Sequence, residues 1–193
     1  MDPPIKEIIE ANQATLTQFQ KDIVMDSNSI HILPAYFNFI ECYLATNSEP
    51  EIKKYLTVAL SNLSFSNKKK DENKELETQE DIEEEILLSK DKQEKTSKID
   101  LLFGQYLLNT SKFKQAKEKI INSILLYSEI YGPESIGLTP NYYYLASCFL
   151  NENAKNQESY PDSEVIAKNM YLKIADCWKK FFLGEKHDMF DCK

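Results

Sequence analysis

Few residues in this sequence have the types and the spacing that chemistry requires. The cysteines and histidines show no CxxC pair and no dense cluster; they are Cys42, Cys148, Cys177, Cys192, His31 and His187. A structural zinc site needs four such ligands, which usually occur as closely spaced pairs. The sequence therefore predicts no metal site, and the cysteines are expected to be reduced.

The candidate catalytic groups also lack the neighbours that would activate them. Glu83 and Glu84 are adjacent carboxylates in a charged segment, where we expect nothing to shift their pKa values. His187 precedes Asp188 near the end of the sequence, and no Ser or Cys nucleophile has a nearby base. The chain has no Arg and only 4 widely spaced glycines, so it offers neither a guanidinium fork nor a Gly-rich phosphate loop. We expect no enzymatic activity and no cofactor.

Charge and hydropathy restrict the possible partners. The net charge of -8 argues against nucleic-acid and anionic-membrane partners, because both need a positive surface. No apolar run approaches the roughly 20 residues of a membrane span. The N-terminal sequence MDPPIKEIIEANQ has neither the basic start nor the apolar stretch of a signal peptide. A chain of this size usually makes one domain and is expected to bury a real core.

The elements that position these side chains are all predicted to be helices. Apolar residues recur at steps of three and four over about 5–24, 33–44, 52–63, 99–107, 113–131, 139–150 and 163–181. Pro34 is tolerated in the first turn of the second helix. Gly132 and Pro133 end the fifth, with the glycine expected in the left-handed C-terminal conformation.

A charged segment interrupts this pattern. There are 7 Lys and 11 Asp or Glu between Lys68 and Lys95, and such a stretch buries too little apolar surface to offset the entropy of ordering. The sequence therefore predicts three parts: an N-terminal helix with a first helix pair over 1–66, a largely disordered insert over 67–96, and two helix pairs with a frayed tail over 97–193. In the alternative, residues 81–96 lengthen the next helix, because apolar side chains occur there at Ile82, Ile86 and Leu87.

Internal repeats are visible in two alignments. Residues 29–36 (SIHILPAY) match residues 135–142 (SIGLTPNY) at an offset of 106, and Ile40, Gly104 and Ala146 align as equivalent positions in three first helices. Ala116 follows Gly104 by 12 residues, and small residues at such positions let two helices cross closely.

The spacing of these positions suggests the repeat class. Gly104 and Ala146 are 42 residues apart. Ile40 and Gly104 are 64 residues apart, a spacing that falls to about 34 once an insert of about 30 residues is removed. A spacing of about 34 residues is the tetratricopeptide repeat (TPR) period. The fold class expected is all-α, a TPR-like helical solenoid of about three helix pairs plus an N-terminal half-repeat. An ordinary helical bundle is the alternative.

Particular motifs in these units resemble a ciliary family. The stretch 126–183 contains Tyr131-Gly132, Ser135-Ile136, Tyr143-Tyr144-Leu145-Ala146, Ala167-Lys168-Asn169-Met170-Tyr171 and Trp178. It is similar to the last TPR unit of the MYND-finger-containing axonemal proteins associated with inner-arm dynein. Residues 29–63, with Leu33-Pro34-Ala35-Tyr36, resemble an earlier unit of the same family. The resemblance covers most of the chain except the charged segment.

The resemblance implies a scaffold subunit of the ciliary axoneme at the base of an inner dynein arm. Its partners would be the dynein heavy chain or doublet-associated proteins, together with a second TPR protein. Two departures limit the comparison. The chain lacks the dense Cys and His run of a MYND finger, so no zinc role carries over, and it is shorter, with fewer repeats.

The first helices of TPR pairs usually line a concave face that receives a partner helix or peptide. The candidate partner-binding residues on them are Phe37, Glu41, Leu44, Leu101, Gln105, Leu108, Tyr143, Ser147 and Leu150. The apolar members fit a core equally well. A second interpretation is a general cytosolic TPR adaptor of the co-chaperone kind. Such adaptors clamp a terminal carboxylate with Lys, Arg and Asn, whereas the corresponding places here hold Glu41, Gln105 and Ser147.

Overall fold

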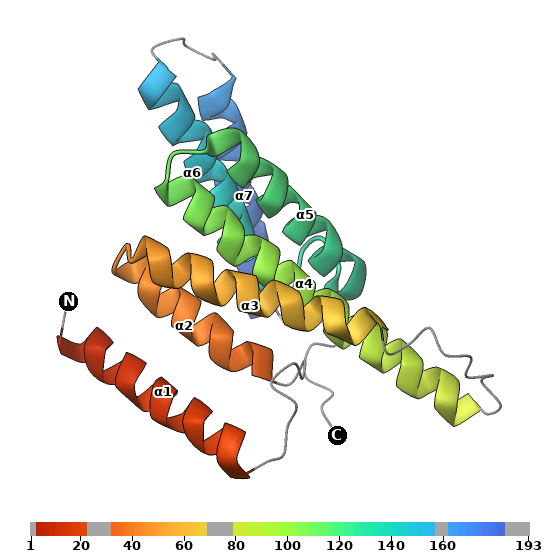
Figure 1. Cartoon of the computed structure of the whole chain (residues 1–193). Helices are drawn as coiled ribbons and strands as arrows, with labels where there is room; N and C mark the ends of the chain where they lie inside the picture. The colour runs from red at the N-terminus through yellow and green to blue at the C-terminus, as the bar shows by residue number, and fades with distance from the viewer. Residues whose placement is uncertain (1–2, 23–31, 69–78, 157–161, 184–193) are drawn as a thin grey trace. The chain divides into compact units, whose positions relative to one another are not determined.

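The computed structural model describes residues 3–22, 32–68, 79–156 and 162–183, and no strand occurs in these ranges. The elements are α1 (Pro3–Asp22), α2 (Leu33–Ala45), α3 (Glu49–Lys68), α4 (Gln79–Asn109), α5 (Phe113–Tyr131), the short 3-10 helix η2 (Ile136–Leu138), α6 (Thr139–Asn156) and α7 (Ser163–Phe182) (Figure 1). The all-α class predicted from the sequence is confirmed. Two compact units divide the chain, Met1–Leu102 and Phe103–Lys193.

Most helix ends agree with the sequence prediction. α2 begins at Leu33 with Pro34 in its first turn, where the missing backbone N–H has no helical partner to lose. α7 begins at Ser163, and Glu164 near its start and Lys180 near its end complement the helix dipole. α6 continues six residues past the predicted end at Leu150, to Asn156. The predicted frayed tail after Leu183 lies outside the described residues.

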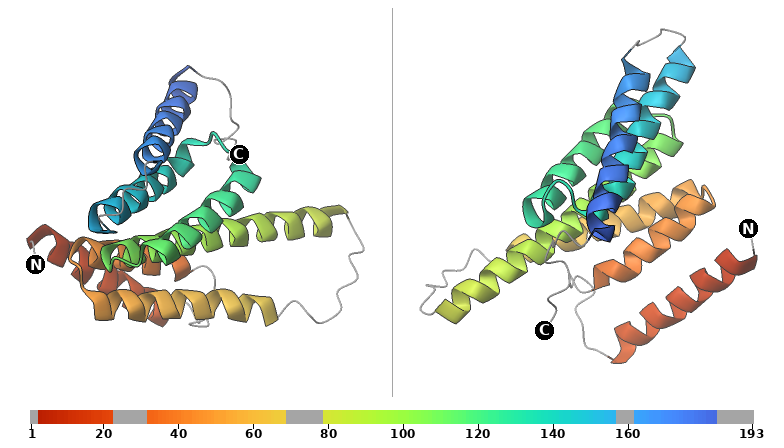
Figure 2. Two further views of the ribbon diagram at one scale, coloured as in Figure 1. Left: turned by 90° about the horizontal axis from the view of Figure 1, so that it is seen from above. Right: turned by 180° about the vertical axis from the view of Figure 1, so that it is seen from behind.

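The first unit contains an antiparallel helix pair, α2 and α3, with α1 packed on α2 (Figures 1 and 2). Its seam is aromatic. The Tyr55 ring of α3 lies against three rings of α2, with centroid separations of 6.0 Å to Tyr36, 4.9 Å to Phe39 and 5.7 Å to Tyr43. Phe39 is fully buried. Burial also raises the pKa of the Tyr36 and Tyr43 phenols, since the ionised form would lose its hydration.

The turns that follow α2 and α4 share one hydrogen-bond pattern. After α2, the backbone N–H of Asn47 donates to the Leu44 carbonyl and that of Ser48 donates to the Tyr43 carbonyl. Asn47 has a positive φ of 52°. These two bonds with a left-handed residue between them form a Schellman motif, which satisfies carbonyls left free at a helix end.

After α4 the same atoms recur 64 residues later. Ser111 has a φ of 63° and donates to the Leu108 carbonyl, and Lys112 donates to the Leu107 carbonyl. The Thr110 hydroxyl bonds to carbonyls one turn back, as that of Thr46 does after α2. An offset of 64 residues is also the one that aligns Ile40 with Gly104, so the repeat found in the sequence is present in the backbone of both turns.

The charged segment differs from its predicted structure. α3 ends at Lys68 and α4 begins at Gln79, so the disordered insert predicted over 67–96 is wrong for residues 67–68 and 79–96, which are helical. Residues 69–78 lie outside the described part of the chain. The alternative in which Ile86 and Leu87 extend the next helix is the one observed. Charged pairs one turn apart help to stabilise this exposed helix, and Lys95 Nζ lies 2.6 Å from Asp91 Oδ2.

The second unit contains the close crossing predicted at Gly104. A Cβ atom placed on Gly104 would lie 2.5 Å from Ile120 Cγ1 and 3.4 Å from the Ala116 carbonyl oxygen, both in α5. Ala116 and Ile120 are fully buried. Only a residue without a side chain allows α4 and α5 to approach this closely.

The rest of the second unit is held together by apolar contacts and ion pairs. α5 packs on α6 and α6 packs on α7 (Figure 2). Lys117 of α5 pairs with Glu152 of α6 at 2.6 Å, and Lys180 of α7 pairs with Glu134 before η2. α5 ends at Tyr131 as predicted, but Gly132 has φ 82° and ψ 156° rather than a left-handed helical conformation. That region of backbone space is also open almost only to glycine.

Candidate functional site

The predicted partner-binding residues of α2 divide into buried and exposed groups. Phe37 and Leu44 are buried, and so is Leu101 of α4, which places them in the core. This is the alternative that the sequence left open for apolar residues. Glu41 is exposed, and Lys98 Nζ donates to its carboxylate at 2.5 Å. An ion pair between two partly exposed side chains contributes little to the free energy of folding.

The predicted residues of the second unit are more accessible. Gln105 and Leu108 of α4 are half-buried. On α6, the Tyr143 side chain is 51% exposed and Leu150 is 37% exposed. The Ser147 hydroxyl lies between them and donates to the Tyr143 carbonyl at 3.0 Å. Tyr143, Ser147 and Leu150 follow one another at steps of four and three, so one side of α6 carries an accessible, mostly apolar row.

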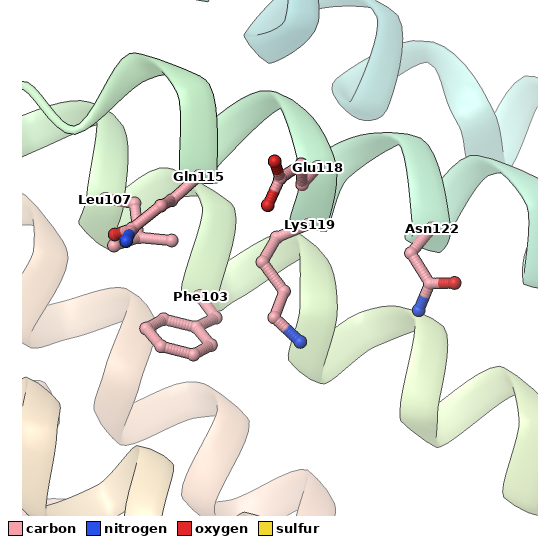
Figure 3. Close-up of a pocket in the computed structure, with 6 residues that line it drawn as sticks. All are labelled: Phe103, Leu107, Gln115, Glu118, Lys119 and Asn122. Atoms are coloured by element: carbon pink, nitrogen blue, oxygen red, sulfur yellow. The ribbon is translucent and has the colours of Figure 1, made fainter.

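A pocket lies between α4 and α5 of the second unit (Figure 3). It has a volume of about 410 Å³ and is lined by Phe103, Leu107, Gln115, Glu118, Lys119 and Asn122. Lys119 Nζ lies 5.5 Å from the centroid of the Phe103 ring, a cation–π geometry. An apolar wall with polar side chains beside it suits one inserted side chain of a protein partner.

An accessible apolar surface on α7 was not singled out from the sequence. Exposed large apolar side chains on α7 and just after it are Val165, Tyr171, Leu172, Trp178, Phe181, Phe182 and Leu183. From the sequence, the apolar residues over 163–181 predicted a helix, without assigning them to a buried or an accessible face. In the sequence, the 4-3-4 spacing of Tyr171, Ala175, Trp178 and Phe182 could have indicated a second apolar stripe beside the buried one.

Of the side chains considered for chemistry, the structure describes Cys42, Cys148 and Cys177, while His31, His187, Asp188 and Cys192 lie outside the described residues. Among the described residues no group of three or more His, Cys, Asp or Glu side chains is arranged to hold a metal ion. Cys148 and Cys177 are buried, and Cys42 is half-buried. Burial raises the pKa of the Cys148 thiol to about 12, because a thiolate there would be poorly solvated. A thiol in such surroundings is a poor nucleophile.

This environment predicts slow labelling of Cys148 in the folded protein. At pH 8 an ordinary thiol with a pKa near 8.5 is about one quarter thiolate, whereas a thiol with a pKa of about 12 is about 0.01% thiolate. We therefore expect iodoacetamide to modify Cys148 roughly 1,000-fold more slowly in the native chain than in urea. Peptide mapping by mass spectrometry measures both rates. Comparable rates in the two states would contradict the burial of this thiol.

No helix within the described ranges has both the length and the apolar character needed to cross a membrane. The candidate functional site consists of the accessible surfaces of the second unit: the row of Tyr143, Ser147 and Leu150 on α6, the apolar side chains of α7, and the pocket between α4 and α5. Comparisons of the chain with family models, with curated proteins and with solved structures found no match.

Proposed function

We propose that this protein is a non-enzymatic scaffold or adaptor subunit, a TPR-like solenoid that holds other proteins through accessible helix faces. The observation that carries the proposal is the repeated helix pair. The Schellman turns at Asn47 and Ser111 are equivalent at an offset of 64 residues, and Gly104 lies at a close crossing in the second pair. Helix pairs that repeat in this way build a surface for protein partners rather than a reaction site.

The accessible face of the second unit favours an amphipathic helix as the partner. Tyr143 and Leu150 present apolar area on α6 with only the Ser147 hydroxyl between them. Apolar side chains at helical spacing complement the apolar face of another helix. A terminal carboxylate, in contrast, needs a cluster of cationic donors. Glu41, Gln105 and Ser147 offer no cation at the corresponding places, which argues against the co-chaperone alternative.

The setting of this function comes from the family resemblance. We propose the ciliary axoneme, where the protein would help to anchor or regulate an inner dynein arm. Its partners there would be the dynein heavy chain or doublet-associated proteins, with a second TPR protein beside it. The motifs that carry the resemblance include Tyr143-Tyr144-Leu145-Ala146, which lies on the accessible α6.

Affinity purification of the tagged full-length chain from ciliated cells, read by mass spectrometry, tests this proposal. We expect dynein-arm and doublet proteins to be recovered. Tyr143→Ala and Leu150→Ala should each lower that recovery about fivefold, the effect of losing roughly 1 kcal/mol of contact energy. Leu125→Ala is the matched control, because Leu125 is an exposed apolar residue of α5 outside the α6 row.

Three results would count against the proposal. Recovery of chaperones in place of axonemal proteins would favour the adaptor alternative. A tagged protein spread evenly through the cytosol, with no axonemal fraction, would remove the ciliary setting. Equal recovery with Tyr143→Ala and Leu125→Ala would remove the α6 row as the contact surface.

A further inference from the structure

The N-terminal part of α4 exposes three large apolar side chains in succession. Ile86, Leu87 and Leu88 are 50%, 69% and 42% exposed. Ser89 and Lys90, which follow them, are exposed as well. Soluble proteins rarely expose a run of consecutive apolar residues unless a contact uses it, because such a run favours association. These three side chains are therefore candidates for a contact with another molecule.

The helix is strongly acidic at the same place. Residues 79–88 contain 5 carboxylate residues and no Lys, so they contribute a charge of -5, whereas the net charge of the whole chain is -8. A Glu precedes each of the three exposed apolar residues by three positions; these are Glu83, Glu84 and Glu85. Positions three apart on a helix are neighbours on one side of it. Each exposed apolar position therefore has a carboxylate position one turn before it.

Stabilisation of α4 itself accounts for only part of this pattern. Carboxylates favour the start of a helix because the helix dipole is positive there, but the effect falls off within the first turn. Glu80 and Asp81 are in the first turn of α4, whereas Glu84 and Glu85 are in the second. The dipole also gives no reason for apolar side chains to be exposed. The second-turn carboxylates and the apolar run therefore serve no purpose within the helix alone.

We infer that residues 79–88 of α4 are a docking surface for a cationic amphipathic helix of another protein. Charge complementarity decides between the possible occupants, because this acidic stretch attracts a basic partner and repels nucleic acid, an anionic membrane or a second copy of itself. A helix with Leu and Lys or Arg one turn apart repeats the pattern of α4 with the opposite charge. The inference concerns the first unit and does not depend on the function proposed above.

Binding of a synthetic peptide to the full-length chain tests the inference. The probe is the fluorescein-labelled peptide LKKLLKLLKKLLKL, which as a helix has one apolar and one cationic side. We expect saturable binding in fluorescence anisotropy. Raising the salt from about 50 mM to about 500 mM should weaken it at least about tenfold, because salt screens ion pairs between exposed side chains.

Two other probes separate charge from apolar contact. The peptide LEELLELLEELLEL keeps the apolar side and reverses the charge, so it should bind at least about 100-fold more weakly. Labelled poly-lysine keeps the positive charge without apolar side chains, and it should bind at least about tenfold more weakly than the amphipathic peptide.

Substitution of the most exposed apolar residue tests the surface itself. Leu87→Gln should raise the dissociation constant of the cationic peptide about fivefold or more, because the contact loses apolar area while the net charge stays the same. Leu125→Gln is the matched control, since Leu125 is a 56% exposed residue of α5. It should leave the dissociation constant within about twofold of the wild type.

Substitution of the carboxylates tests the charge in the same way. The double variant E83Q/E84Q should also weaken binding about fivefold or more, and it should reduce the dependence on salt. E7Q/E10Q removes the same charge from exposed positions of α1 and should have less than about a twofold effect. Glutamine is a good helix former, and far-UV circular dichroism checks that the helicity of each variant is unchanged.

Several results would overturn the inference. Binding of the cationic peptide that is absent, or equally weakened by Leu87→Gln and Leu125→Gln, would place no contact at this surface. Poly-lysine as tight as the amphipathic peptide would show that charge alone attracts the probe. Equal effects of E83Q/E84Q and E7Q/E10Q would show that the net charge of the chain, and not the start of α4, selects the partner.

Discussion

Replacing Phe39 with alanine is expected to lower the free energy of unfolding by about 3–5 kcal/mol. Phe39 is fully buried in the seam between α2 and α3, and its ring stacks on Tyr55 at a centroid distance of 4.9 Å and an interplanar angle of 12°. Alanine removes the ring, and the surrounding Tyr36 and Tyr43 rings can fill the cavity only in part. Urea unfolding followed by far-UV circular dichroism measures the loss.

Two further variants make this result interpretable. Phe39→Leu keeps much of the apolar volume and should cost less, about 1–1.5 kcal/mol. Asn38→Ala changes an exposed neighbour on the same helix and should fall within about 0.5 kcal/mol of the wild type. Since whole domains are stable by only about 5–15 kcal/mol, Phe39→Ala could leave its unit largely unfolded. A cost for Phe39→Ala no larger than that of Asn38→Ala would show that the aromatic seam does not form.

Gly104→Ala is expected to destabilise the second unit by about 1–2 kcal/mol, although alanine is the better helix former. Helix propensity alone predicts a gain of about 1 kcal/mol for this change. The new methyl group, however, would lie 2.5 Å from Ile120 Cγ1 in a fully buried position. Overpacking of this kind costs about 1–3 kcal/mol, and we expect it to exceed the gain because Ile120 is fully buried. Urea unfolding followed by Trp178 fluorescence reports on this unit.

A double-mutant cycle separates the two terms. Ile120→Ala removes the atoms that collide with the new methyl group, so Gly104→Ala in that background should become neutral or stabilising by up to about 1 kcal/mol. The coupling energy between the two sites should therefore reach about 2 kcal/mol, within the range for residues in contact. Additive effects of the two substitutions would contradict the close crossing of α4 and α5.

Local sequence signals were sufficient to predict where most of the helices lie. α2, α5 and α7 start where Pro34, the turn before Phe113 and the polar loop before Ser163 indicate, because caps and breakers act over a few residues. The offset of 64 residues that aligns Ile40 with Gly104 is also the offset between two turns with the same hydrogen bonds. The charged segment was the main error. Residues 79–96 are helical because they continue the strongly periodic α4. An existing helix extends easily into neighbouring residues, and the amino-acid composition of a segment does not reveal this.

The candidate site was less predictable than the fold. Phe37, Leu44 and Tyr143 were equivalent candidates in the sequence, yet Phe37 and Leu44 are buried whereas Tyr143 is 51% exposed. The exposed apolar side chains of α7 were not distinguished from core residues, because Tyr171 and Trp178 have the same spacing as buried residues. Periodicity shows that a helix has an apolar side, but it does not show whether another helix covers that side.

The sequence by itself determined the all-helical class, most of the helix limits, the repeat of the first two helix pairs and the scarcity of catalytic groups. Each of these follows from propensities and spacings within a few turns of chain. Only the tertiary structure decided which apolar faces are buried, that Gly104 meets Ile120 and that Trp178 remains accessible. Burial depends on residues far away in the chain, and no local pattern contains that information.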